Sequence, residues 1–313
     1  MTAPRDHGGG IDAAIARFGG TRTGWLDLST GINPVAYPVP PVAPDAWTAL
    51  PDRAAQAALE DAARAFWRVP DGAAVLAAPG ASSLIARIPA LAPPGQVDIP
   101  GPTYNEHAAA FSHAGWSVGP GNAARVVVSP NNPDGRVWTA SEATAGDPAL
   151  LVIDESFADA MPGEGLSALA TRPGTLILKS FGKFWGLAGL RLGFAIGDPG
   201  MIRALAEMLG PWPVSGLALA IGATALGDHD WTEATRARLR GDADRLDALM
   251  QARGARVQGG TPLFRLYDVD DAAGWQDRLA RAHVWSRVFP YSDRWLRLGL
   301  PAPDRWAQLE SAL

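Results

Sequence analysis

The chain contains no cysteine and only two lysines, against 25 arginines, in its 313 residues. Without cysteine it cannot form disulfides, bind a metal through thiolates or use a cysteine nucleophile, and we expect no metal site. A formal net charge of −5 gives no support for nucleic-acid binding, which favours a basic surface. The N-terminal residues lack the apolar core of a secretory signal, so we expect a cytoplasmic protein.

The sequence also lacks a membrane span. The stretch from Met208 to Gly227 carries no charge, but Pro211 and Pro213 interrupt its first third. Too few helical residues remain to cross a hydrocarbon layer of about 30 Å. We therefore expect a buried helix at a domain junction in this stretch.

What is present describes an ordinary globular protein, with 47% apolar and 19% charged residues. A chain of this length can bury a large core, and we expect one catalytic unit of two unequal domains. Short aliphatic runs alternate with helical stretches through the middle of the chain. Because these runs are continuously apolar, both faces of their sheet should be covered, as in a mainly parallel α/β fold. The predicted strands are residues 74–77, 125–128, 150–153, 175–178 and 192–196.

Polar residues directly follow four of these predicted strands, at 80–82, 129–135, 154 and 180–183. Ligands of open α/β sheets bind beyond the carboxyl ends of the strands, so these residues are predicted to share one site. Each also has an ordinary explanation. Gly80-Ala81-Ser82 can simply cap a helix, Asp154 can cap a turn, and Asn132 can be a turn residue.

The last third of the chain has a different character. Residues 231–253 predict a helix that buries Leu239, Leu246 and Met250 and ends at Gly254, with its arginines and aspartates on a solvated face. Alternating runs follow it. They suit a small α/β domain completed by the N-terminal arm, and they lie at residues 263–267, 284–289 and 295–298.

One of the two lysines, Lys183, carries the strongest chemical signal. Arginine stays protonated in proteins, whereas a desolvated lysine can become neutral and form an imine with an aldehyde. Ser180 and Arg191 are residue types that would hold a phosphate beside such an imine. The backbone N–H groups of Gly80-Ala81-Ser82 are suited to the same phosphate.

The segment from Ser180 to Gly193 resembles the lysine motif of the fold-type I, class I/II aminotransferase-like enzymes that use pyridoxal 5'-phosphate (PLP). Asn132-Pro133-Asp134-Gly135 is similar to the family's Asn-Pro-x-Gly turn, and Asp154-Glu155-Ser156-Phe157 to its Asp-Glu-Ala-Tyr strand end. The resemblance implies a large domain with a mainly parallel seven-stranded sheet between helices, and a small α/β domain. The implied parts are an N-terminal arm of the small domain and substrate site at 1–44, the large PLP-binding domain at 45–228 and the C-terminal small domain at 229–313.

The same resemblance implies a role for each residue of the cofactor site. Lys183 would form the imine, Asp154 would pair with the pyridine nitrogen, and Asn132 would bond the 3'-oxygen. Tyr104, in Pro102-Thr103-Tyr104, would stack on the ring. The cofactor phosphate would lie against Gly80, Ala81, Ser82, Ser180 and Arg191.

Two positions depart from the family pattern. Phe157 stands where many relatives have a tyrosine that donates to the 3'-oxygen, so the pKa of the imine should be tuned differently. Leu50 stands where relatives carry a tyrosine that reaches the cofactor phosphate of the neighbouring subunit. A homodimer is still implied by the family, but that contact is not.

Within the family, the chain resembles two branches that act on phosphorylated substrates. Pro211-Trp212-Pro213-Val214-Ser215 is similar to a segment of the histidinol-phosphate aminotransferases. Three segments favour the L-threonine O-3-phosphate decarboxylases of cobalamin biosynthesis: His7-Gly8-Gly9-Gly10, residues 27–34 with Gly31 in place of an asparagine, and residues 102–107. Arg287 matches the position where both branches use an arginine for the substrate phosphate; its alternative is a solvent-facing strand residue.

The implied reaction is PLP-dependent decarboxylation of L-threonine O-3-phosphate to (R)-1-amino-2-propanol O-2-phosphate. Arg297 would clamp the α-carboxylate, and the other implied substrate residues are His7, Gly31, Asn33 and Arg287. Transamination of a phosphorylated amine such as histidinol phosphate is the alternative, because the sequence does not show which bond at the α-carbon is aligned for cleavage. A PLP-binding protein without turnover is less favoured, because it needs no imine lysine together with an electron sink.

Overall fold

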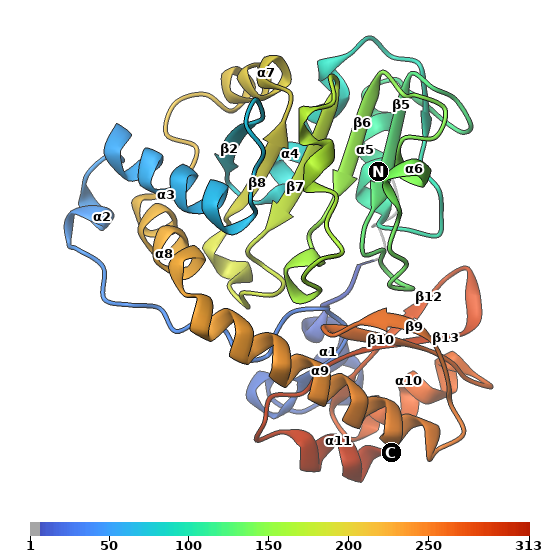
Figure 1. Cartoon of the computed structure of the whole chain (residues 1–313). Coiled ribbons are helices and arrows are strands. Elements are labelled where there is room, and N and C mark those ends of the chain that lie inside the picture. The colour runs from blue at the N-terminus through green and yellow to red at the C-terminus, as the bar shows by residue number, and fades with distance from the viewer. Residues whose placement is uncertain (1–6) are drawn as a thin grey trace. The chain divides into compact units, whose positions relative to one another are not determined.

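The predicted strands form one seven-stranded sheet in the computed structural model, which describes residues 7–313 (Figure 1). The strand order is β2-β8-β7-β6-β5-β3-β4. β8 runs antiparallel to β2 and β7, whereas the other neighbouring pairs are parallel. This confirms the mainly parallel α/β sheet. The strands are β2 (Ala74–Ala78), β3 (Gln96–Asp98), β4 (Ser117–Val118), β5 (Ala124–Val128), β6 (Leu150–Asp154), β7 (Thr175–Ser180) and β8 (Gly193–Gly197).

Helices cover both faces of this sheet. Leu178 and its register partner Ala195 belong to a buried cluster that α4, α5 and α7 join on one face. Phe194 points to the opposite face, because side chains alternate along a strand. There its ring packs against Trp67, directly after α3, with centroids 4.9 Å apart. These helices are α3 (Arg53–Phe66), α4 (Ala81–Ile85), α5 (Asn105–His113) and α7 (Pro199–Leu209).

The charge-free stretch from Met208 to Gly227 is divided between two helices. It contains the end of α7, a loop with both prolines, and α8 (Gly216–Gly227), which begins where Ser215 Oγ accepts a hydrogen bond from Ala218 N at 3.2 Å. Leu219 and Ile221 of α8 are buried, as predicted. Between residues 7 and 313, no helix is long and apolar enough to cross a membrane.

A second sheet contains four antiparallel strands in the order β12-β13-β10-β9. Near it, β1 pairs in parallel with β11, which joins the N-terminal segment to the C-terminal part of the chain. The strands are β1 (Leu26–Asp27), β9 (Arg256–Thr261), β10 (Phe264–Asp268), β11 (Val284–Trp285), β12 (Arg287–Phe289) and β13 (Ser292–Gly299). The helices of this part are α1 (Ile11–Phe18), α10 (Ala272–Arg281) and α11 (Trp306–Ala312).

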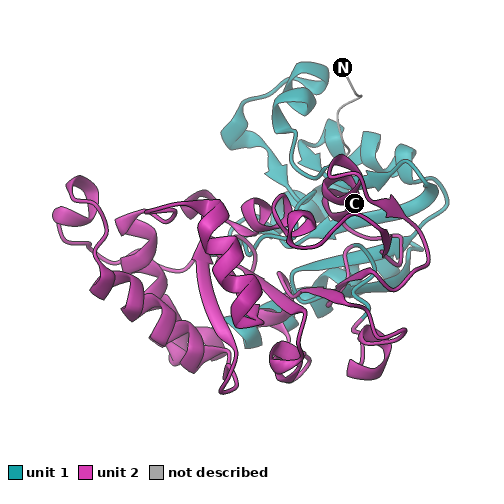
Figure 2. Ribbon diagram, turned by 90° about the horizontal axis from the view of Figure 1, so that it is seen from above, with its two compact units in different colours: residues 1–35, 133–136, 234–313 teal, residues 36–132, 137–233 magenta. Residues whose placement is uncertain are grey.

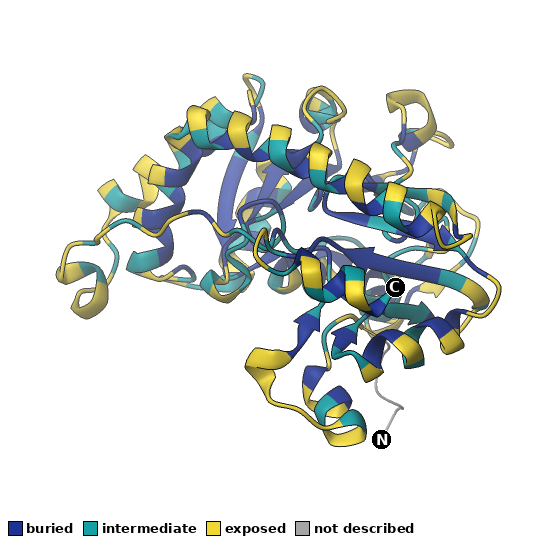
Figure 3. Ribbon diagram, turned by 90° about the horizontal axis from the view of Figure 1, so that it is seen from below, coloured by how far each residue is buried: buried dark blue, intermediate teal, exposed yellow. Residues whose placement is uncertain are grey.

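Helix α9 (His229–Gln251) is the predicted charged helix, and it begins and ends two residues earlier than expected. It buries Leu239, Leu246 and Met250, while exposed and buried residues alternate along it (Figure 3). Gly254 follows with φ +86°, a backbone conformation that glycine adopts readily after a helix. The remaining short elements are α2 (Asp45–Thr48), α6 (Ala140–Ala143), and the 3-10 helices η1 (Arg22–Gly24), η2 (Ile88–Leu91), η3 (Ala158–Ala160), η4 (Ser167–Thr171) and η5 (Ala188–Leu190).

The chain divides into two compact units (Figure 2). Unit 1 contains residues 1–35, 133–136 and 234–313, and unit 2 contains residues 36–132 and 137–233. The short piece 133–136 belongs to unit 1 because it lies against β9, where Gly260 N donates to Asp134 O at 2.8 Å. The domain borders expected from the sequence remain a prediction.

Candidate active site

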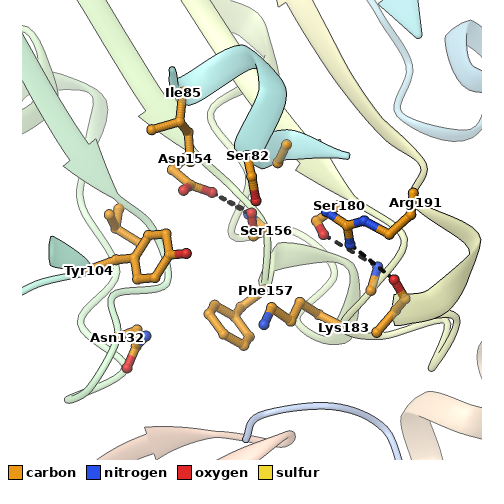
Figure 4. Close-up of a pocket in the computed structure, with 14 residues that line it drawn as sticks. Ser82, Ile85, Tyr104, Asn132, Asp154, Ser156, Phe157, Ser180, Lys183 and Arg191 are labelled. Atoms are coloured by element: carbon orange, nitrogen blue, oxygen red, sulfur yellow. Dashed lines mark hydrogen bonds between the residues drawn. The ribbon is translucent and has the colours of Figure 1, made fainter. Parts of the chain in front are cut away.

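The carboxyl ends of β2, β5, β6 and β7 lie at one edge of the large sheet and surround a pocket in unit 2 (Figure 4). The pocket encloses about 640 Å³ of empty space, including its open mouth. Eight of the nine predicted cofactor residues line it: Ala81, Ser82, Tyr104, Asn132, Asp154, Ser180, Lys183 and Arg191. The ninth, Gly80, lies directly beside the guanidinium of Arg191. The structure therefore brings the predicted set together.

Two glycines allow the backbone to close tightly at one end of the pocket. Gly80 has φ +82°, and a Cβ there would lie 2.6 Å from Arg191 Nη2. A Cβ on Gly193 would lie 2.4 Å from the backbone nitrogen of Ala81. Since Gly193 pairs with Ser180 across β7 and β8, the absence of these side chains brings Ser180, Arg191 and the Ala81 N–H group to the same place. Hydroxyl, guanidinium and amide donors therefore gather at this end of the pocket.

Lys183 lies in a loop that is anchored on both sides of the lysine. Phe181, Phe184 and Trp185 are fully buried, and Gly186 N donates to Lys183 O at 3.1 Å. The Lys183 side chain is half-buried, and its Nζ lies 5.3 Å from the centre of the Phe157 ring. Phe157 thus brings an apolar ring close to the amine of Lys183.

Asp154 is a buried carboxylate with three hydrogen-bond donors. His107 Nε2 lies 2.9 Å from Oδ2, while Ser156 donates from its backbone nitrogen at 2.9 Å and from Oγ at 2.5 Å to Oδ1. Burial by itself raises the pKa of Asp154, but the hydrogen bond and charge of His107, with the hydrogen bonds from Ser156, lower it below the usual value. Asp154 therefore remains ionised at neutral pH and can pair with a protonated ring nitrogen.

Sequence patterns did not assign three residues to this site: His107, Asn131, and Ser156, which lines the pocket and donates to Asp154. His107, on α5, is 1% exposed and holds Asp154, 47 positions further along the chain. Asn131 accepts from Thr103 Oγ1 at 2.6 Å and donates to Pro102 O at 3.0 Å, which fixes the loop that carries Tyr104. The spacing of His107 three residues after Tyr104 was a signal, since such residues share one face of a helix.

Two of the predicted substrate residues, Arg287 and Arg297, are register partners on β12 and β13 in unit 1. Arg297 is 5% exposed, and its Nη2 donates to Ser29 O at 2.6 Å. Burial and the neighbouring charge of Arg287 lower the pKa of Arg297 to about 10, against smaller opposite effects of Tyr291 and Asp27. Arg297 therefore remains charged at neutral pH, and the two neighbouring guanidinium groups form a strongly positive site.

The N-terminal segment contacts both of these arginines. Arg287 Nη1 donates to His7 O at 2.5 Å, and Gly9 N donates to Ser29 Oγ at 2.7 Å. Gly31, which follows in the same N-terminal segment, is buried. Asn33 is also buried, and its Oδ1 accepts from Arg238 Nη2 at 2.5 Å and from Val35 N at 3.1 Å. The side-chain oxygen of Asn33 thus shapes the local backbone.

Comparisons with known proteins identify the family and the fold of the chain. Residues 120–312 match the sequence model of the family described as aminotransferase class I and II. A threonine-phosphate decarboxylase from Sinorhizobium sp is 42% identical over 97% of this chain and 95% of the relative. Another from Pseudomonas aeruginosa is 38% identical over 98% and 97%. The solved structure of histidinol-phosphate aminotransferase from Sinorhizobium meliloti, in complex with pyridoxal-5'-phosphate, superimposes with a TM-score of 0.83 at 18% identity. The match covers 100% of this chain and 94% of the aminotransferase chain, which shows that the two share a fold.

Proposed function

The chain belongs to the class I and II aminotransferase family and is a PLP-dependent enzyme, and on that premise we propose that it decarboxylates L-threonine O-3-phosphate. The bond between the α-carbon and the carboxylate breaks, carbon dioxide leaves, and the electron pair left on the α-carbon takes up a proton. The product is (R)-1-amino-2-propanol O-2-phosphate. The observation that carries this proposal is the 42% identity to a threonine-phosphate decarboxylase over nearly the whole length of both chains.

The pocket of unit 2 has the donor set that PLP requires. When bound, the cofactor supplies an electron sink for the negative charge that develops at the α-carbon. We assign its phosphate to the hydroxyls of Ser82 and Ser180, the guanidinium of Arg191 and the Ala81 N–H group. These groups meet where Gly80 and Gly193 leave no room for a β-carbon, and hydroxyl, guanidinium and amide donors suit a phosphate.

The remaining pocket residues act on the ring and the amine. Asp154 would stabilise the protonated ring nitrogen, Tyr104 would stack on the ring and Asn132 would donate to its 3'-oxygen. Lys183 Nζ is the amine that holds the cofactor. When it is free, the same Nζ would be the proton donor to the α-carbon.

The two arginines of unit 1 fit the two anionic groups of the substrate. We assign the α-carboxylate to Arg297 and the phosphate to Arg287, with the His7 segment closing around the phosphate. A guanidinium binds either group through two parallel hydrogen bonds, which fixes orientation as well as affinity. Binding a dianion also relieves the repulsion between Arg287 and Arg297 that lowers the pKa of Arg297.

The test is to incubate the PLP-loaded protein with L-threonine O-3-phosphate without any keto acid, and to measure carbon dioxide and aminopropanol phosphate. Equal amounts of both over many turnovers are expected. L-threonine is the matched control and should react far more slowly, because it lacks the group that Arg287 binds. If neither product forms, and histidinol phosphate is converted only when 2-oxoglutarate is present, the chain is instead an aminotransferase.

We further propose that the enzyme supplies the aminopropanol phosphate of cobalamin biosynthesis and acts in the cytoplasm as a homodimer. Support for a homodimer comes from unit 2, where Trp47 is 70% and Leu50 67% exposed, and Trp212 is more than half exposed. These segments are neighbours, since a Cβ on Gly216 would lie 2.6 Å from Ala46 O. Such exposed apolar side chains favour a covered surface.

The dimer is tested by light scattering after size exclusion. The substitution pair Trp47→Glu/Leu50→Glu should convert a dimer to a monomer. Val118→Glu, at an exposed apolar residue on β4, is the control and should leave the mass unchanged. A monomeric wild-type protein would contradict the proposal.

A further inference from the structure

Both lysines of the chain lie in one short segment, at the end of β7 and in the loop after it. Lys183 lines the pocket, as does Ser180. Lys179 points to the other face of the sheet, because neighbouring side chains in a strand alternate. In a chain that otherwise uses arginine, a lysine at this second position needs its own explanation.

Lys179 forms a buried ion pair with Glu155. Its Nζ lies 2.5 Å from Glu155 Oε2, and the two residues are 3% and 1% exposed. Glu155 directly follows Asp154, and Lys179 directly precedes Ser180. The ion pair therefore joins β6 to β7 immediately behind two residues that line the pocket.

A second polar contact joins the same two segments. Asp159, in η3, is 5% exposed and accepts from Trp185 Nε1 at 3.0 Å and from Trp67 Nε1 at 2.8 Å. Trp185 lies two residues after Lys183, and its ring stacks on Phe181 with centroids 4.9 Å apart and planes at 9°. Asp159 thus holds the loop of Lys183 through a ring that is itself rigidly packed.

We propose that these two contacts, Glu155–Lys179 and Asp159–Trp185, act as a clamp that fixes the position of Lys183 relative to Asp154. The clamp joins segment 154–159 to segment 179–185, and Trp67 lies between its two halves, 5.6 Å from Lys179 Nζ by its ring centre. The inference rests on the proposed roles of Asp154 and Lys183 at the two ends of the cofactor ring. None of the four clamp residues lines the pocket, so they are positioning residues.

Stability alone does not account for the ion pair. Transferring two charges into a protein interior is costly, and apolar residues of similar volume are often as stable or more so. What a buried ion pair supplies is one defined geometry. A misplacement of about 1 Å between reacting groups can cost about 100-fold in rate, so a defined distance between Asp154 and Lys183 has direct value for catalysis.

The first test removes the ion pair without leaving a single buried charge. Glu155→Gln/Lys179→Met should fold with a Tm near that of the wild type. Its lysine-bound cofactor should show a shifted pH titration in the absorption spectrum, and kcat should fall about 10- to 100-fold with a smaller change in KM. The titration needs no substrate, so it separates failure of the clamp from failure of the proposed decarboxylase reaction.

The matched control is the ion pair of Asp98 and Arg125, which are register partners on β3 and β5 of the same sheet. Asp98→Asn/Arg125→Met should leave the titration and kcat unchanged. An unchanged titration and kcat in the Glu155/Lys179 variant would overturn the clamp. Equal changes in both double variants would also overturn it, since they would show a general response of the sheet.

A second test uses the two indoles that donate to Asp159. Trp185→Phe and Trp67→Phe each remove one N–H donor and keep an aromatic ring, but only Trp185 belongs to the loop of Lys183. We expect the absorption titration to shift in Trp185→Phe and to stay near the wild type in Trp67→Phe. Equal shifts, or none in Trp185→Phe, would show that Asp159 does not position the lysine.

Discussion

Asp154 in unit 2 and Arg297 in unit 1 are both buried charged groups, but their surroundings treat that charge in opposite ways. Around Asp154, the donors His107 and Ser156 outweigh burial and favour the ionised carboxylate. Around Arg297, burial and the like charge of Arg287 disfavour the ionised guanidinium. The charge of Asp154 is stabilised by its neighbours before any ligand arrives, whereas the charge of Arg297 is destabilised by its surroundings.

The difference matches the two kinds of ligand that we propose for these sites. A resident cofactor benefits from a partner charge that is already stabilised and oriented, since it stays through many turnovers. A substrate must bind and its product must leave. A positive site whose repulsion an anion relieves gives binding energy to the phosphorylated substrate.

Lys183→Ala should have the largest effect, because it removes the amine that would hold the cofactor and donate the proton. Decarboxylation should fall by about 10⁴-fold or more, and the absorbance of the lysine-bound cofactor should disappear. Circular dichroism and Tm should remain close to the wild type, because the side chain is only half-buried. Retained turnover would refute the role assigned to Lys183.

Arg287→Ala breaks the positive site of unit 1 and should have the next largest effect. We expect kcat/KM for L-threonine O-3-phosphate to fall about 100-fold, since a hydrogen bond to a charged group contributes about 1.5–3 kcal/mol. The rate with L-threonine should change little. Equal losses for the two substrates would place the phosphate site elsewhere.

His107→Phe sharpens the comparison by removing the main donor to Asp154 while leaving it buried. Because burial raises the pKa of Asp154 and His107 lowers it, the pKa should rise in the variant. In the wild type, Asp154 stays ionised at pH values below 3.8, the usual pKa of an aspartate. It becomes protonated only as pH falls through its lowered pKa. The acid limb of the kcat profile should therefore move to higher pH, with a loss of about tenfold at neutral pH.

The control for this prediction is His113→Phe, at an exposed position on the same helix. It should leave the kcat profile unchanged. If the acid limb of His107→Phe coincides with that of the wild type, His107 does not set the ionisation of Asp154.

The smallest expected effect is on stability. Inorganic phosphate should raise the Tm of the PLP-loaded protein by about 2–4 °C, because an anion relieves the repulsion around Arg297. The loaded protein is required so that the cofactor occupies the other phosphate site. In Arg287→Ala this rise should be lost, and a rise of the same size there would mean that phosphate binds elsewhere.

The sequence predicted the parts of the site that follow single strands. Asp154 directly follows one apolar run and Lys183 lies in the loop after another. Because carboxyl ends of parallel strands share one edge, their meeting followed from local pattern. The contacts of His107 and Lys179 could not be predicted in this way. They depend on which face of a helix or strand meets which neighbour, and their partners lie 47 and 24 positions away.

The same limit applies to unit 1. Arg287 and Arg297 could be named by resemblance, but their pairing across β12 and β13 follows from the register of a hairpin with a bulge. A shift of one residue would have placed one of the two side chains on the other face. Register of this kind is set by packing and turn geometry, which single-chain patterns do not determine.

The most direct test of the central claim is to run the reaction with L-threonine O-3-phosphate in D₂O and examine the product by NMR. Decarboxylation at the α-carbon predicts aminopropanol phosphate that retains the original α-hydrogen and gains one deuterium at the same carbon. Loss of the α-hydrogen with the carboxylate retained would contradict the account, because the enzyme would then break the C–H bond, as an aminotransferase does.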